Sequence, residues 1–130
     1  MTEPRNETEN LVEKPLPEPT AVTVDEVMTR LGRGEPIVFL DSRPEEEWKS
    51  ADVKIKGAIR IAPKDVDRYL QLIPRTRSLV TYCMGPHEIW SARVAQKIAW
   101  DGWNKDVHQL YGGLEAWRKA GGAVEPKELT

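Results

Sequence analysis

Two short runs of apolar residues constrain the fold of this chain more than any other feature of its sequence. The first lies within PIVFLDS (36–42) and the second within SLVTYC (78–83). Because polar residues do not alternate regularly with apolar ones, each run is typical of a strand that is buried on both faces. Such strands belong to parallel sheets covered by helices, so the two runs predict an α/β fold.

Segments with helical spacing separate the predicted strands. Thr23 and Glu26 have the spacing of a capping box, which predicts a helix that ends near Gly32 or Gly34. Further helices are predicted over 44–51, 63–73, 91–101 and 112–122, and further strands over 57–62 and 106–110. This alternation predicts a central parallel sheet with helices on both sides.

The length of 130 residues suits one folded domain. Residues 1–20 are rich in Pro and Glu and contain few large apolar side chains, so we expect a flexible N-terminal arm. The folded domain is expected over 21–126, followed by a short tail at 127–130.

Charge and hydropathy exclude several classes of partner. Lys and Arg number 19 against 21 Asp and Glu, and a net charge of −2 provides no basic field for binding nucleic acid. No apolar stretch is long enough to cross a membrane, and the N-terminal sequence lacks the features of a signal peptide. We therefore expect a cytoplasmic protein that binds neither nucleic acid nor membrane.

The chain contains a single cysteine, Cys83, at the end of a predicted strand and before a predicted helix. One cysteine cannot form an internal disulfide. Ligands of parallel α/β sheets bind at the carboxyl ends of the strands, and amides of a loop before a helix can stabilise a thiolate by lowering its pKa. A lone cysteine also commonly serves as a small buried hydrophobic residue, but this position favours a functional thiol.

An ordered set of motifs resembles the single-domain rhodanese-like sulfurtransferase family over residues 22–125. The motifs are FLDSRPEEEW, KGAIRIAP, LVTYC, SARVAQKIAWDGW and LYGGLEAWRKAG. The resemblance implies a three-layer α/β/α domain with a mostly parallel sheet of about five strands. It also implies that Cys83 takes a sulfane sulfur from a donor such as thiosulfate, holds it as a persulfide and passes it to cyanide, a thiol or a protein acceptor.

The resemblance assigns further residues to the site. The small sulfur-containing anion or persulfide donor would bind to the loop made of Met84, Gly85, Pro86, His87, Glu88, Ile89 and Trp90. Asp41, Arg43 and Ser91 would support this loop, with Asp41 and Arg43 as an internal ion pair. No cofactor is implied. Cys83 and His87 alone are too few ligands for a metal site.

The loop departs from the family pattern in its length and charge. Seven residues separate Cys83 from Ser91, where about five are usual, and none of them is Arg or Lys. Counted forward from Cys83, the usual position of the cation holds Glu88; counted back from Ser91, it holds Trp90. His87 either supports the thiolate or lies in solvent, and Trp90 either lines a pocket or anchors the helix.

The departures leave two alternatives to sulfur transfer. One is a binding or sensing module without catalysis, and the weaker one is a cysteine-dependent phosphatase. Three glutamates at 45–47 are interpreted as a solvated helix start rather than as catalytic acids.

Overall fold

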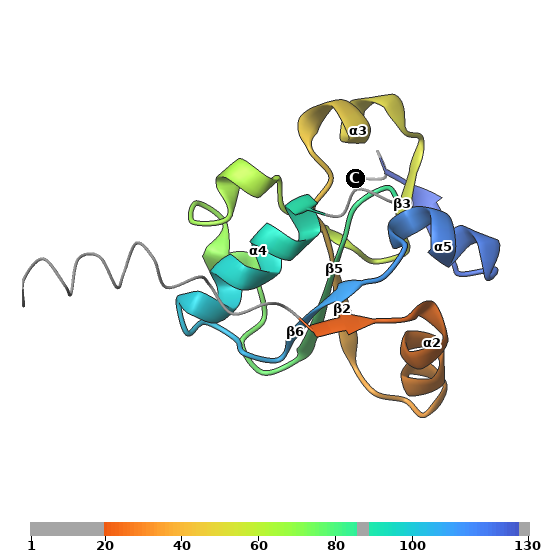
Figure 1. The fold of residues 1–130 in the computed structure, drawn as a ribbon, viewed down its shortest axis with the longest axis horizontal. Helices are drawn as coiled ribbons and strands as arrows, with labels where there is room; N and C mark the ends of the chain where they lie inside the picture. Colours follow the sequence, from red (N-terminus) through yellow and green to blue (C-terminus); the bar gives the residue numbers. More distant parts are fainter. Residues whose placement is uncertain (1–19, 86–88, 128–130) are drawn as a thin grey trace, which may run out of the picture.

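The computed structural model describes residues 20–85 and 89–127. A sheet of five parallel strands forms its centre (Figure 1). The strands, in chain order, are β1 (Thr20–Val22), β2 (Ile37–Asp41), β4 (Ile59–Arg60), β5 (Ser78–Tyr82) and β6 (Val107–Leu110). Their order across the sheet is β1-β6-β5-β2-β4, so the two apolar runs lie side by side at its centre. The predicted α/β fold is confirmed.

The two central strands have the burial that their sequences predict. β2 and β5 pair along their whole lengths, from Ile37 opposite Ser78 to Asp41 opposite Tyr82. Every residue of β5 is buried. Neighbouring residues of a strand face opposite sides of the sheet, so β5 needs apolar cover on both faces.

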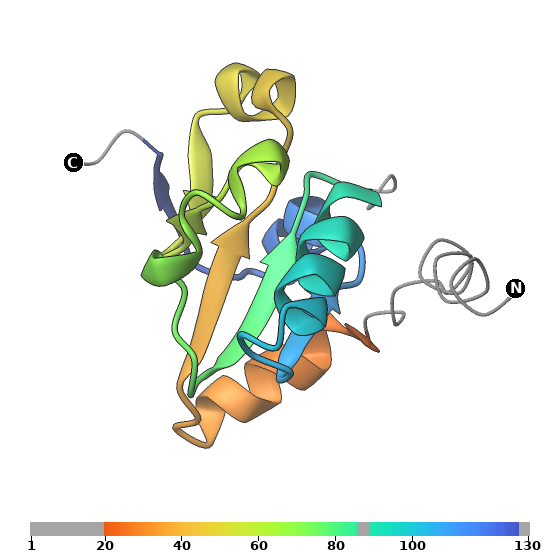
Figure 2. The ribbon, with the colours of Figure 1, turned by 90° about the vertical axis from the view of Figure 1, so that its left-hand side faces the viewer.

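Helices supply this cover in two layers (Figure 2). α2 (Val24–Gly32) and α5 (Gly113–Lys119) pack on one face, in a core that includes Phe39 and Val80. α4 (Ile89–Trp100) packs on the other face, in a core that includes Leu40 and Leu79. The predicted α/β/α layers are therefore present. None of the helices in the described ranges is long and apolar enough to cross a membrane.

Local signals fix the start of α2 as predicted. The Thr23 hydroxyl accepts a hydrogen bond from the Glu26 amide at 3.1 Å, and the Glu26 carboxylate accepts one from the Thr23 amide at 2.9 Å. The capping box is confirmed. The predicted helix over 44–51 is also present as α3 (Glu45–Ser50).

The prediction of one helix over 63–73 is wrong. The segment instead contains two single-turn 3-10 helices, η1 (Pro63–Asp65) and η2 (Leu70–Leu72). Asp65 and Asp67 have low helix propensity, and a helix of eleven residues is marginal unless packing stabilises it. Only Val66 and Ile73 are buried in this segment.

A small second sheet was not predicted. β3 (Val53–Ile55) pairs antiparallel with β7 (Val124–Pro126), and Lys54 forms a 3.4 Å ion pair with Glu125 across them. Charged residues alternate along both short segments, so neither contains an apolar run. Their pairing depends on residues about seventy positions apart in the chain, which local sequence patterns do not reveal.

Candidate functional site

Cys83 directly follows β5 at the carboxyl edge of the central sheet. The amide of Ser91, in the first turn of α4, donates a hydrogen bond to its Sγ at 3.1 Å. The thiol lies 3.8 Å from the carbonyl oxygen of Ser42, to which it donates. Two neighbouring strand ends and one helix start therefore meet at the sulfur, which is fully buried.

The environment of Cys83 favours the protonated thiol. Burial raises the pKa of Cys83 to about 11, and the negative charges of Glu47 and Asp41 add to this effect. Hydrogen bonds from Ser91 act in the opposite direction, but they are outweighed. The prediction of a lowered pKa was therefore wrong, because it counted the amides of the helix start and omitted desolvation.

The residues that follow the thiol are fixed on the start of α5. The amide of Leu114 donates to the carbonyl oxygen of Cys83 at 2.8 Å, and the amide of Glu115 donates to that of Met84 at 2.9 Å. Gly113 makes this approach possible, because a Cβ there would lie 2.5 Å from the Cys83 oxygen. The amides of the first turn of α5 are therefore used to hold the chain beside the thiol.

Two carboxylates lie against the two residues that follow Cys83, Met84 and Gly85. The Met84 amide donates to Glu47 Oε1 at 3.2 Å, and Glu47 is only half exposed. A Cβ on Gly85 would lie 2.8 Å from the carboxylate of Glu115. The interpretation of 45–47 as a solvated helix start is therefore wrong for Glu47. Sequence reasoning missed both carboxylates because nothing local links them to Cys83.

A buried ion pair lies beneath the site, as predicted. Arg43 Nη2 lies 2.7 Å from Asp41 Oδ2, and both side chains are fully buried. The Tyr82 hydroxyl donates to the same carboxylate at 2.8 Å, and burial together with the Asp41 charge raises the pKa of Tyr82. Arg60 donates to the carbonyl oxygens of Asp41 and Arg43. These bonds fix the backbone on both sides of Ser42.

One nitrogen of Arg43 makes no conventional hydrogen bond. Its Nη1 is buried and has no hydrogen-bond partner within the described ranges. The guanidinium carbon lies 5.2 Å from the ring centroid of Trp48 and 5.9 Å from that of Tyr82. These aromatic faces stabilise the charge in place of a further hydrogen bond.

Two adjoining hollows lie beside the site and share Trp90. The smaller, of about 160 Å³, is lined by Pro44, Glu45, Ala62, Pro63, Lys64 and Trp90. The larger, of about 330 Å³, is lined by Pro63, Lys64, Val66, Asp67, Trp90, Arg93, Gln96 and Lys97. Trp90 lines both hollows, but Cys83 is not among the residues that line either, so both roles considered for Trp90 stay predictions.

The predicted loop is only partly described. Met84 is half-buried and Gly85 is buried, whereas Ile89 and Trp90 are exposed and belong to the first turn of α4 rather than to a loop. Pro86, His87 and Glu88 lie outside the described residues, so the role considered for His87 stays a prediction. In ranges 20–85 and 89–127, no three potential metal-ligating side chains lie together.

Comparison of the chain with models of known protein families finds a match to one family. The model of the rhodanese-like domain matches residues 23–120. Among solved structures, the rhodanese-like domain of an Anabaena protein is 28% identical, with 88% of this chain and 85% of that chain covered and a TM-score of 0.68. A Bacillus halodurans protein is also 28% identical, with coverages of 95% and 86% and a TM-score of 0.65.

A third similar structure has a different description. It is a Rhodopseudomonas palustris protein of unknown function, described as a possible tyrosine phosphatase, and it is 25% identical. The similarity covers 82% of this chain and 84% of that chain, with a TM-score of 0.68. No curated protein matches.

Proposed function

The chain belongs to the rhodanese-like domain family, and from this premise we propose that it is a sulfurtransferase that carries a sulfane sulfur on Cys83. One observation carries the proposal. The only thiol of the chain lies at the carboxyl edge of the central sheet, with the Ser91 amide directed at its sulfur. This is the edge at which α/β proteins of this type bind their ligands.

The proposed reaction has two steps. In the first, the Cys83 thiolate attacks the outer sulfur of thiosulfate, a new S–S bond forms, and sulfite leaves with the electron pair of the broken bond. In the second, cyanide or an acceptor thiolate attacks the outer sulfur of the persulfide, and the Cys83 thiolate is released. A persulfide donor loads Cys83 in the same way, with a thiolate as the leaving group.

The residues around Cys83 have separate roles in this proposal. The Ser91 amide stabilises negative charge on the sulfur in the thiolate. The Asp41–Arg43 pair fixes the backbone of Ser42, next to the sulfur. The amides at the start of α5 fix the Cys83 and Met84 carbonyls, so the sulfur keeps its place while the donor approaches.

The reaction requires two changes from this resting arrangement. The sulfur is fully buried, so part of its cover must move before a donor can reach it. The thiol must also lose its proton, and a pKa of about 11 leaves about one molecule in ten thousand as thiolate at pH 7. We therefore expect slow sulfur transfer at neutral pH and faster transfer in alkaline solution.

A steady-state assay tests the proposal. Thiosulfate and cyanide are mixed with the protein, and thiocyanate formation is followed. A small persulfide donor with a thiol acceptor forms the second arm. We expect turnover in at least one arm and none with Cys83→Ser. Equal rates for the two proteins, or no turnover in either arm, would contradict the proposal.

A binding module without catalysis is the second candidate. The full burial of Cys83 and its raised pKa favour this candidate, because a structural cysteine has these properties. If the protein is such a module, neither arm of the assay should show turnover, although the protein stays folded.

Phosphate ester hydrolysis is supported only by the description of the Rhodopseudomonas palustris relative. None of the seven residues between Cys83 and Ser91 is an arginine, so the loop lacks the guanidinium that could bind a phosphate group through two hydrogen bonds. We expect no release of phosphate from a generic aryl phosphate under conditions that give sulfur transfer.

A further inference from the structure

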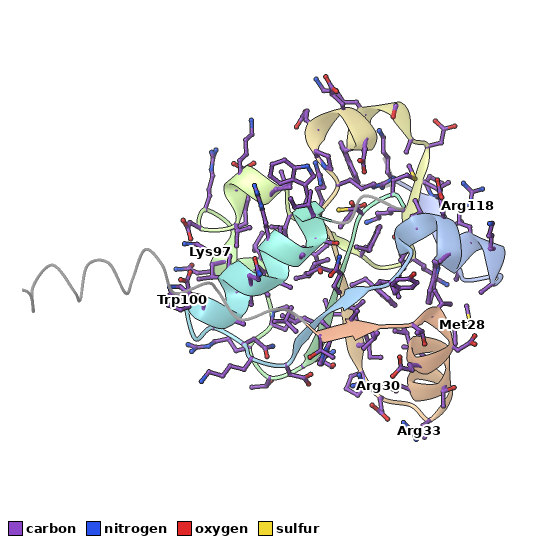
Figure 3. The ribbon with its side chains drawn as sticks, viewed as in Figure 1. Met28, Arg30, Arg33, Lys97, Trp100 and Arg118 are labelled. Atoms are coloured by element: carbon purple, nitrogen blue, oxygen red, sulfur yellow. The ribbon has the colours of Figure 1, made fainter. Side chains whose placement is uncertain are left out.

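The two hollows share Pro63, Lys64 and Trp90 and form one groove, called here the basic groove and defined by Pro63, Lys64, Trp90, Arg93 and Lys97. Its three cations outnumber the two carboxylates in its lining, Glu45 and Asp67, and Glu45 lies 3.6 Å from Lys49. The groove runs along the exposed side of α4, opposite η1. Figure 3 labels Lys97 near the far end of α4 and places it away from Arg30 and Arg33 of α2. The groove is a surface feature distinct from the buried thiol.

Two cations of the groove have no acidic partner among the described residues. Lys97 lies 3.5 Å from Asp67 and 3.8 Å from Asp101. By contrast, Lys64 and Arg93 form no ion pair within ranges 20–85 and 89–127, and the Arg93 guanidinium carbon lies 5.2 Å from the ring centroid of Trp90. The groove therefore combines two available positive charges with an aromatic wall. This combination suits a ligand with carboxylates on both sides of apolar groups.

The chain itself contains such a sequence outside the described residues. Residues 1–19 include five glutamates against one arginine and one lysine. Within them, ENLVE (9–13) has Leu11 and Val12 between Glu9 and Glu13. Two carboxylates around an apolar pair are complementary to two cations around the Trp90 ring.

The length of this segment allows it to reach the groove. The described chain begins at Thr20 on β1, an edge strand of the sheet whose neighbour β6 packs against α4. A domain of this size has a radius of gyration of about 13 Å. Glu13 and Glu9 precede Thr20 by seven and eleven positions, which an extended chain spans with about 23 and 36 Å.

We propose that residues 9–13 bind in the basic groove of the same chain, with their carboxylates paired to Lys64 and Arg93 and their apolar side chains against Trp90. Exposed ion pairs are individually weak. The covalent connection through residues 14–19 compensates for this weakness, because it gives residues 9–13 an effective concentration in the millimolar range near the groove.

The basic groove adjoins the candidate site along the chain. Trp90 directly precedes Ser91, whose amide contacts the thiol, and Pro44 of the smaller hollow follows Arg43. The contact lies within one chain, so its binding can be measured whether or not the protein transfers sulfur.

Paramagnetic broadening in the full chain tests the contact. A nitroxide is attached to Asn10→Cys in a Cys83→Ser background, so that one thiol is labelled, and amide and indole signals are recorded at low and high salt. We expect broadening of the Trp90 indole and of the Lys64 and Arg93 amides, and its loss at high salt. The Arg30 and Arg33 amides are the comparison, because both arginines already pair with Glu35. Equal broadening on α2 would contradict the proposal.

Charge reversal in the unlabelled chain provides an independent test. Glu9→Lys with Glu13→Lys should lower occupancy of the groove about ten-fold and shift the Trp90 indole signal. The matched control, Glu3→Lys with Glu7→Lys, makes the same change of charge and should leave that signal nearly unchanged. Combining Glu9→Lys and Glu13→Lys with Lys64→Glu and Arg93→Glu should restore the original contact. An unchanged indole signal, or broadening that disappears on dilution and so comes from a second copy, would overturn the proposal.

Discussion

The chemistry proposed for this chain depends on one sulfur atom and on the balance of forces around it. Burial raises the pKa of Cys83 to about 11, although the Ser91 amide stabilises the ionised form. Only the thiolate is nucleophilic, so the pH of the solution controls how much reactive Cys83 is present.

The pH dependence of Cys83 alkylation follows from this balance. Because the pKa lies far above neutral, the thiolate fraction and the rate should increase about ten-fold per pH unit from pH 7 to about pH 10. The rate with a small neutral reagent such as iodoacetamide, followed by intact mass, measures it. A plateau below about pH 9 would mean that the thiol has an ordinary or lowered pKa. The alkylation rate of free cysteine, measured as a control, should reach its plateau at a lower pH.

Glu47 offers a way to change the charge beside Cys83 while keeping the hydrogen bond to Met84. Glu47→Gln retains an oxygen that accepts from the Met84 amide, but it removes a negative charge that raises the pKa of Cys83. We expect a lower alkylation pKa and a kcat/KM for thiosulfate that is about three-fold higher. The pH profile and the steady-state assay measure the two effects.

Two further variants separate charge from hydrogen bonding at Glu47. Glu47→Ala also loses the hydrogen bond, so it should reduce the free energy of unfolding by about 1 kcal/mol. Glu46→Gln makes the same change of charge at an exposed position on α3 and should have little effect. A Glu47→Gln variant that behaves like Glu46→Gln would show that this carboxylate does not control the thiol.

At the scale of elements, the junction between β5 and α5 fixes the site. Gly113 has a φ of 60°, and a Cβ there would meet the Cys83 carbonyl oxygen at 2.5 Å. Gly113→Ala should therefore destabilise the fold by about 3 kcal/mol and change the alkylation rate of Cys83 as the loop moves. Denaturant unfolding and the alkylation assay measure these effects.

Gly121 provides the matched control for this element. It also has a positive φ, of 82°, but a Cβ at this position would meet no atom of the described residues within 4 Å beyond its chain neighbours. Gly121→Ala should cost about 1 kcal/mol through backbone strain and leave Cys83 reactivity unchanged. Equal losses of stability in the two variants would argue against close packing at Gly113.

The elements that the sequence predicted correctly have local signals, although the helical spacing over 63–73 was misleading. The apolar runs of β2 and β5 and the capping box of α2 are contained in a few adjacent residues. β3 and β7 lack such runs and are stabilised by pairing with each other, so local patterns did not reveal them. The same limit applies to the site. Cys83 and the Asp41–Arg43 pair were predicted, whereas the contact with Glu47 and the burial of the thiol depend on tertiary packing.

At the scale of the whole molecule, the parallel sheet brings distant segments to one edge. β2 and β5 are neighbours, so their ends place Ser42 and Cys83 together, and α4 adds Ser91. The basic groove lies beside this edge, and the acidic segment proposed to bind it precedes β1. The fold thus provides a protected sulfur and, next to the edge of the sheet, a basic surface.

The central claim is that Cys83 holds a transferable sulfur. Intact mass spectrometry after incubation with thiosulfate or a small persulfide at alkaline pH tests it most directly. We expect a mass increase of one sulfur atom on the wild-type chain, none on Cys83→Ser, and loss of the added mass when cyanide or a thiol is supplied. A wild-type chain that stays folded and gains no sulfur from any of these donors would contradict the account.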